Sequence, residues 1–209
     1  RTLEWVKASA KAGKPWVVAN DEQGPASCGA PPDPEYQGWN GKDAKGNVVH
    51  TLHDIRKYTL WANLMAGGAG VEYYFGYQLP QNDLLCQDWR SRDATWDYSR
   101  IALEFFHRFD VPFWDMENAN ALIGNPEDTN DRYALAQAGK VYVVYLPEGG
   151  SVELDLAGAK GTFAVGWFNP REGGELVRGA VDTVDGGATV SLGSAPDGND
   201  WAILVRRVE

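Results

Sequence analysis

Residues 140–170 read KVYVVYLPEGGSVELDLAGAKGTFAVGWFNP, and this stretch indicates the fold of the second half of the chain. Short apolar pieces alternate here with glycine turns such as Glu148-Gly149-Gly150. Several short strand-like pieces at regular spacing are typical of an antiparallel β-sandwich. The same spacing continues on both sides of the stretch. The expected strands are residues 133–137, 140–147, 151–156, 162–170, 175–179, 188–193 and 200–207.

The first half of the chain has a different pattern. Helical periodicity occurs near the N-terminus, in residues 51–66 and in residues 97–109, with Asp97 as the expected N-cap of the last helix. The apolar run 16–19 and residues 70–78 are expected to be strands, each followed by a long polar loop. A continuous apolar run predicts a strand covered on both faces, as in parallel sheets. Long loops after strands are typical of a (β/α) barrel, whose active site those loops build.

The predicted fold class is therefore α/β followed by all-β. Residues 1–115 are expected to be the C-terminal portion of a (β/α)8 catalytic barrel. This would be a partial TIM barrel made of its last two β/α units, since a whole barrel needs eight. Residues 116–209 are expected to form an antiparallel β-sandwich accessory domain.

Composition and charge exclude several classes of partner. The chain has 209 residues, with 19 Lys and Arg against 29 Asp and Glu, so its formal net charge is −10. No Lys/Arg-rich cluster is present, which argues against nucleic acid and anionic membrane as partners. No cofactor-binding fingerprint occurs, so no cofactor is expected. Cys28 and Cys86 lack the spacing of a zinc site, and either a disulfide or two free buried thiols would fit them.

Carboxylates follow the first expected strand directly. Residues 14–24 read KPWVVANDEQG, so Asp21 and Glu22 come at the end of the apolar run. Polar strand ends are common, and a plain turn is one interpretation. The other is catalysis, because a glycosidase needs two carboxylates that flank the scissile bond. A nucleophilic carboxylate has to stay ionised, and Asn20 and Gln23 are candidate hydrogen-bond donors to it.

The second expected strand adds aromatic residues and a further acid. Glu72 is interpreted as a paired structural carboxylate, while Tyr74 and Tyr77 are candidates for a sugar subsite. Trp89 could form a wall of the same cleft, although residues 87–100 fit an ion-pair network that braces a loop better. His50 and His53 have no third residue at metal-ligand spacing, so no metal site is predicted.

Two stretches together resemble a known family. Residues 14–24 and 53–78 look like the end of the catalytic barrel in apiosidase-like glycoside hydrolases. The matching positions are Arg56, Trp61, Leu64, Gly67, Gly68 and Gly70. The tail, with WFNPREGG at 167–174, resembles the C-terminal sandwich of that family, which is named for collagen binding. The resemblance implies that Glu22 is the nucleophile. The family has Glu-Pro where this chain has Glu22-Gln23, so Asp21 remains a rival.

The resemblance implies a function that this chain would not complete alone. The family's general acid lies on an earlier strand, so the acid/base would come from a second polypeptide or a missing N-terminal segment. The expected reaction is retaining hydrolysis of glycosidic bonds in a polysaccharide or oligosaccharide by a secreted or periplasmic enzyme. The expected substrate-binding residues are Asn20, Asp21, Tyr74, Tyr77 and Trp89. The alternative is a non-catalytic carbohydrate-binding or structural module.

Overall fold

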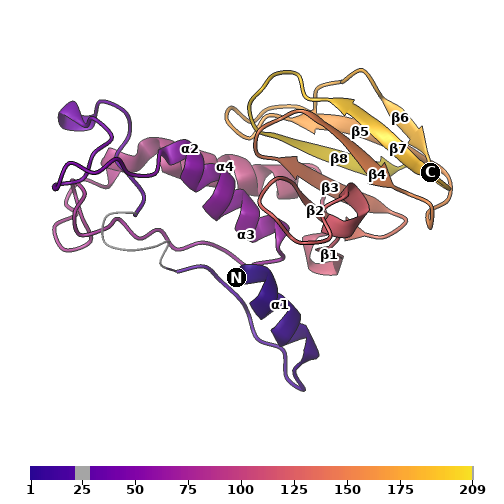
Figure 1. Cartoon of the computed structure of the whole chain (residues 1–209), viewed down its shortest axis with the longest axis horizontal. Coiled ribbons are helices and arrows are strands. Elements are labelled where there is room, and N and C mark those ends of the chain that lie inside the picture. Colours follow the sequence, from indigo (N-terminus) through magenta and orange to yellow (C-terminus); the bar gives the residue numbers. More distant parts are fainter. Residues whose placement is uncertain (22–28, 209) are drawn as a thin grey trace. The chain divides into compact units, whose positions relative to one another are not determined.

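The computed structural model describes residues 1–21 and 29–208 (Figure 1). The chain divides into two compact units. Unit 1 comprises residues 1–64 and 68–100, and unit 2 comprises residues 65–67 and 101–209. Within the part of the chain that the structure describes, no helix has the length and apolar character that crossing a membrane requires.

The α-helices and one π-helical stretch of the described chain lie in residues 2–108. They are α1 (Thr2–Lys11), α2 (Leu52–Asp54), a π-helical stretch (Ile55–Trp61), α3 (Ala62–Met65) and α4 (Asp93–Arg108). A capping box begins α2, because the backbone N–H of Thr51 donates to Asp54 Oδ2 at 2.8 Å and Thr51 Oγ1 accepts from the N–H of Asp54 at 3.2 Å. The last helix begins at Asp93, directly after a 3-10 turn over residues 89–92. The expectation that Asp97 caps it is therefore wrong.

The named strands of the described chain lie in residues 117–207 and pair antiparallel. They are β1 (Glu117–Asn118), β2 (Tyr133–Gln137), β3 (Val141–Leu146), β4 (Ser151–Asp155), β5 (Thr162–Phe168), β6 (Thr183–Asp185), β7 (Thr189–Ser194) and β8 (Trp201–Arg207). A six-stranded sheet has the order β1-β2-β3-β8-β5-β6, and β4 pairs with β7 in a second sheet. In the larger sheet Val143 of β3 lies opposite Leu204 of β8.

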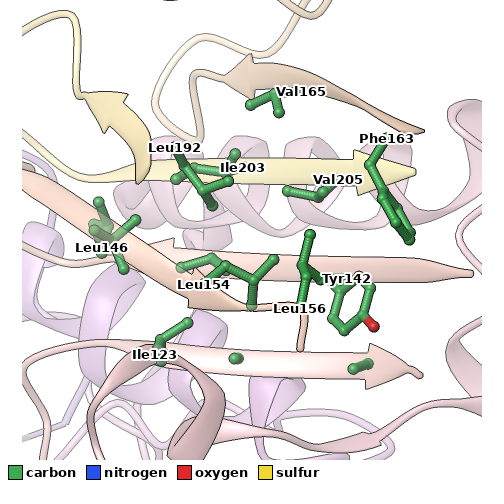
Figure 2. Packing of buried hydrophobic residues seen from close by; sticks show 14 of the residues in the cluster. Ile123, Tyr142, Leu146, Leu154, Leu156, Phe163, Val165, Leu192, Ile203 and Val205 are labelled. Carbon is green, nitrogen blue, oxygen red and sulfur yellow. The ribbon is translucent and has the colours of Figure 1, made fainter. Parts of the chain in front are cut away.

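One apolar core joins the two sheets of unit 2. In β4, Val152 and Leu154 are buried while their neighbours are exposed, which is the alternation expected of a strand with one covered face. Figure 2 shows side chains of β3, β4, β5, β7 and β8 gathered in this core, among them Leu154, Leu192 and Ile203. The opposite face of the larger sheet is covered too, because Phe105 of α4 packs on Phe168 of β5 with ring centroids 4.9 Å apart.

The predicted partial TIM barrel is wrong for the described residues. Residues 16–19 and 73–78 contain no strand, and the parallel pairing that the structure does show is an isolated bridge between Asn20 and Val71. A barrel strand is covered on both sides, whereas Trp16 is 49% and Val17 78% exposed. The apolar run gave the right residue types for a buried strand, but the described chain supplies neither the neighbouring strands nor the covering helices.

Candidate functional site

A short parallel pairing in unit 1 brings two distant segments together. The N–H of Ala69 donates to the carbonyl of Val18 at 2.7 Å, and the N–H of Asn20 donates to the carbonyl of Gly70 at 3.0 Å. The N–H of Glu72 then donates to the carbonyl of Asn20 at 2.8 Å. This evenly staggered pattern is that of parallel strands. It places the residue after Asn20 beside the segment that carries Glu72.

A cleft opens where these two segments meet. Its volume is about 610 Å³, within the ~300–1,000 Å³ usual for ligand pockets. It is lined by Asp21, Glu72, Tyr73, Tyr74, Tyr77 and Asp83. Three carboxylates and three phenol rings therefore face one space. Asp21, Tyr74 and Tyr77 come from the expected substrate-binding set. Glu72, interpreted from sequence as a structural carboxylate, lines the same cleft.

Asp83 fixes the backbone of the aromatic segment. Its Oδ1 accepts from the N–H of Phe75 and its Oδ2 from the N–H of Gly76, both at 2.9 Å. A carboxylate that accepts two backbone hydrogen bonds holds the chain in one conformation. Asp83 lies in a polar loop, and its spacing from residues 75 and 76 gives no sequence signal for this contact. Sequence reasoning therefore missed it.

Close backbone packing supports the same segment from the other side. The N–H of Ala30 donates to the carbonyl of Tyr74 at 2.7 Å. A Cβ added at Gly29 would lie 2.4 Å from the carbonyl carbon of Phe75 and 2.5 Å from the nitrogen of Gly76. No side chain fits there, so a glycine is required for this approach.

The tyrosines are held by defined contacts. The rings of Tyr74 and Tyr77 meet edge to face with centroids 5.6 Å apart. The Tyr73 hydroxyl lies 3.0 Å from Ser99 Oγ, and its ring packs on Trp96 at 5.8 Å. Burial raises the pKa of Tyr73, while the hydrogen bond with Ser99 partly opposes that rise. Tyr73 is therefore a neutral phenol at physiological pH.

Other expected site residues lie elsewhere or outside the description. Trp89 is 62% exposed and is not part of the cleft lining, and its carbonyl accepts from Trp96 Nε1 at 2.9 Å. Asn20 contributes its backbone to the parallel pairing but does not line the cleft. Glu22 falls among residues 22–28, outside the described residues, as does Cys28. Cys86 is an exposed free thiol.

The charged stretch 87–100, which includes a 3-10 turn and the start of α4, has only part of the expected ion-pair network. Arg90 pairs with Asp88 at 2.9 Å and Arg100 with Asp97 at 3.2 Å, both at the surface. Arg92 is instead fully buried. Its Nε donates to the carbonyl of Ala30 at 3.2 Å, and its guanidinium lies 4.3 Å from the centroid of the Phe75 ring. Burial lowers the pKa of Arg92 to about 10. The buried guanidinium of Arg92 therefore packs against the ring of Phe75.

The cleft combines two kinds of recognition. Carboxylates accept hydrogen bonds from hydroxyl groups, and phenol rings offer flat apolar faces together with a polar edge. Polyhydroxylated rings present both kinds of surface. A carboxylate in such a cleft can also act on a bond as a nucleophile or as a general acid or base.

Comparisons with known proteins agree with parts of this description. The family model "Putative collagen-binding domain of a collagenase" matches residues 118–206, which hold all but the two end residues of the two antiparallel sheets. A solved structure described as "Glycoside hydrolase" is similar with a TM-score of 0.67 at 16% identity, covering 99% of this chain and 46% of that one. A glycoside hydrolase family 5 structure from Bacteroides vulgatus ATCC 8482 has a TM-score of 0.63 at 19% identity, covering 99% and 45%.

These structures are similar to the chain in fold. The chain spans less than half the length of each of these two glycoside hydrolases. No curated protein sequence matches it.

Proposed function

We propose that the chain is part of a glycoside hydrolase and that the cleft of Asp21, Glu72, Tyr74 and Tyr77 binds the sugar at the bond to be cleaved. The observation that carries the proposal is the pairing of residues 18–20 with 69–72. It gathers carboxylates and tyrosines from two distant segments into one cleft. The fold similarity to two glycoside hydrolases supports the same assignment.

The proposed reaction is retaining hydrolysis by two carboxylates. Glu22, next to Asp21 in the sequence, attacks the anomeric carbon while a general acid donates a proton to the departing glycosidic oxygen. Water then displaces the enzyme carboxylate from that carbon, and the second carboxylate accepts the proton of the water. Asp21 is the rival nucleophile. We place the acid/base outside this chain, on a second polypeptide or on a preceding segment of a longer protein.

Several finer assignments belong to the same proposal. Tyr74 and Tyr77 would contact the sugar rings, and Asn20 and Trp89, which do not line the cleft, are the other proposed substrate-binding residues. Glu72 would accept hydrogen bonds from sugar hydroxyls. The family would be the apiosidase-like glycoside hydrolases, the substrate a polysaccharide or its fragments, and the location secreted or periplasmic.

Substitution of the carboxylates in the complete protein tests the catalytic assignment. Glu22→Gln should lower kcat/KM for glycoside hydrolysis by at least about a thousandfold, because the nucleophile is lost. Glu72→Gln should mainly raise KM. Glu4→Gln, an exposed acid on α1, is the matched control and should leave both constants unchanged. A large loss in Asp21→Asn combined with an active Glu22→Gln would transfer the nucleophile to Asp21.

Two further measurements test the remaining steps. Proton NMR of the first product should show the anomeric configuration of the substrate, and the inverted configuration would exclude the retaining route. Native mass spectrometry of the natural protein should show either a longer polypeptide or a second subunit. A particle with the mass of one 209-residue chain that still hydrolyses glycosides would contradict the external acid/base.

A non-catalytic module is the second candidate function. It is favoured by the family match to residues 118–206, whose description names binding and not glycoside hydrolysis. Under this alternative the chain would bind a polysaccharide as a soluble monomer, and all three carboxylate variants would leave hydrolysis by the complete protein intact.

A further inference from the structure

A second cleft in unit 1 shares one residue with the carboxylate cleft. Its volume is about 460 Å³, and residues 36–44 and 77–82 supply its lining. Tyr77 lines both clefts, and its side chain is 50% exposed. One ligand that contacts Tyr77 in both clefts would therefore extend from the carboxylates into this second space.

The lining of the second cleft has the chemistry of a sugar subsite. Its aromatic residues are Tyr36, Trp39 and Tyr77. Its amide side chains are Gln37, Asn40, Gln78 and Asn82. An amide carries both donors and an acceptor, so amides can pair with hydroxyl groups of either role. Aromatic faces supply apolar area with little loss of side-chain entropy. Flat aromatic surfaces surrounded by amides suit a polyhydroxylated ring.

Hydrogen bonds fix the aromatic wall of this cleft before any ligand arrives. The Tyr36 hydroxyl donates to Asp88 Oδ2 at 3.0 Å and accepts from Gln37 Nε2 at 3.1 Å. The N–H of Ala44 donates to the carbonyl of Gln78 at 3.1 Å, which ties the two lining segments to each other. A preformed wall reduces the entropy that binding costs.

Backbone strain is concentrated around the same cleft. Glu35, Gln37 and Gln81 have φ angles of 66°, 46° and 51°, a region that non-glycine residues seldom adopt. Gln37 lines the cleft, and the other two adjoin its lining segments. Such conformations cost about 1–3 kcal/mol each and occur most often at ligand sites. Gln78 also carries an Oε1 atom that is buried without a hydrogen-bond partner among the described residues.

We propose that the cleft of Tyr36, Trp39 and Tyr77 is a second sugar subsite, and that the two clefts together bind an oligosaccharide. This inference rests on the proposed function, because it takes the carboxylate cleft as the first subsite. It adds the place where a second sugar residue of the substrate binds. A single sugar fills one cleft, whereas a chain of two or more residues passes Tyr77 and occupies both.

Binding of neutral sugars of different length to the 209-residue chain tests the proposal. The probes are cellotetraose, xylotetraose, mannotetraose, galactotetraose and arabinotetraose, each with its monosaccharide, measured by isothermal titration calorimetry. At least one tetrasaccharide should bind more than about tenfold more tightly than its monosaccharide, since the second cleft adds an aromatic contact. In ¹⁵N–¹H spectra that tetrasaccharide should shift the indole signal of Trp39, assigned from its absence in Trp39→Phe.

Two tryptophan variants distinguish loss of the second subsite from a nonspecific effect of removing a tryptophan side chain. Trp39→Ala should weaken tetrasaccharide binding about tenfold and leave monosaccharide binding unchanged. Tyr77→Ala should weaken both, because Tyr77 lines both clefts. Trp114→Ala is the control, since Trp114 is 81% exposed in unit 2, and it should change neither affinity.

The outcomes distinguish this inference from the proposed function. Tetrasaccharide binding that is equal in Trp39→Ala and in the parent chain would overturn the second subsite. So would failure of every probe to bind. In both cases hydrolysis by the complete protein that depends on Glu22 or Asp21 would leave the proposed function standing. Length-dependent binding without such hydrolysis would support the subsite and overturn the catalytic assignment.

Discussion

Apolar residues on the strands of unit 2 are buried, whereas several apolar residues in the loops of unit 1 are exposed. In unit 2, Leu154 of β4 is 0% exposed, and Phe163 and Trp167 of β5 are also fully buried. In unit 1, Leu84 is 76% and Val17 78% exposed. In unit 2 the apolar faces of the two sheets pack together in one core. The loops of unit 1 leave these two side chains uncovered in the described structure.

A leucine-to-alanine substitution in each unit should show the largest difference in stability between them. Leu154→Ala should lower the free energy of unfolding by about 2–5 kcal/mol, because it removes methyl groups from a packed core and leaves a cavity. Leu84→Ala should change it by less than about 0.5 kcal/mol. Urea denaturation followed by circular dichroism is the measurement. Equal losses would mean that Leu84 is covered in solution, and the contrast between the units would disappear.

A pair of glycines sharpens the comparison within unit 1. Gly29→Ala should destabilise the cleft by about 1–3 kcal/mol, since the added Cβ would overlap the backbone of Phe75. Gly13→Ala is the matched control, because nothing lies within 4 Å of a Cβ at that position. Faster amide exchange at Phe75 and Gly76 in Gly29→Ala alone would verify the close approach. Unchanged amide exchange in both variants would contradict the close approach of Gly29 to the backbone of Phe75 and Gly76.

The smallest expected effect concerns a surface turn of unit 2 that is tied to its core. Trp201 Nε1 donates to Asp197 Oδ1 at 2.9 Å, and with the N–H of Asn199 it lowers the pKa of that carboxyl below its usual 3.8. A lowered folded-state pKa stabilises the fold above the usual value, and this contribution disappears as the pH falls through the folded-state pKa. The turn is partly exposed, so it contributes about 0.5 kcal/mol or less.

Carbon-13 NMR titration of the Asp197 carboxyl checks this effect. Trp201→Phe keeps the ring and removes the donor, so the pKa of Asp197 should rise toward 3.8. An unchanged titration would show that the indole N–H does not act on the carboxylate. The hydrogen bond from Trp201 would then not hold this turn to the core of unit 2.

The strands of unit 2 were predictable because their pattern is local. Alternating residues and glycine turns give β2, β3, β4, β5, β7 and β8 to within one or two residues. Residues 175–179 were expected to form a strand but contribute only a bridge from Val177 to Trp167. The edge strand β6 was missed, because its three residues are too few to show alternation.

The lack of named strands in the described part of unit 1 was not predictable, because an apolar run does not specify what covers it. Trp16 and Val17 have the composition of a buried strand, yet both are largely exposed. Part of the candidate site, in contrast, was predictable from the sequence. Asp21 and Tyr74 were candidates from sequence and line one cleft, where sugar binding remains a prediction. Asp83 acts through two backbone N–H groups, and such contacts leave no trace in residue spacing.

The buried position of Arg92 has a consequence for the charge that an approaching ligand meets. With a pKa of about 10, the guanidinium remains protonated at pH 7 in all but about one molecule in a thousand. Its positive charge acts on Asp83 through a medium that screens less than water. The cleft therefore presents a weaker negative potential than its carboxylates would produce alone. An uncharged ligand gains nothing from that potential, so its binding does not depend on the charge of Arg92 in this way.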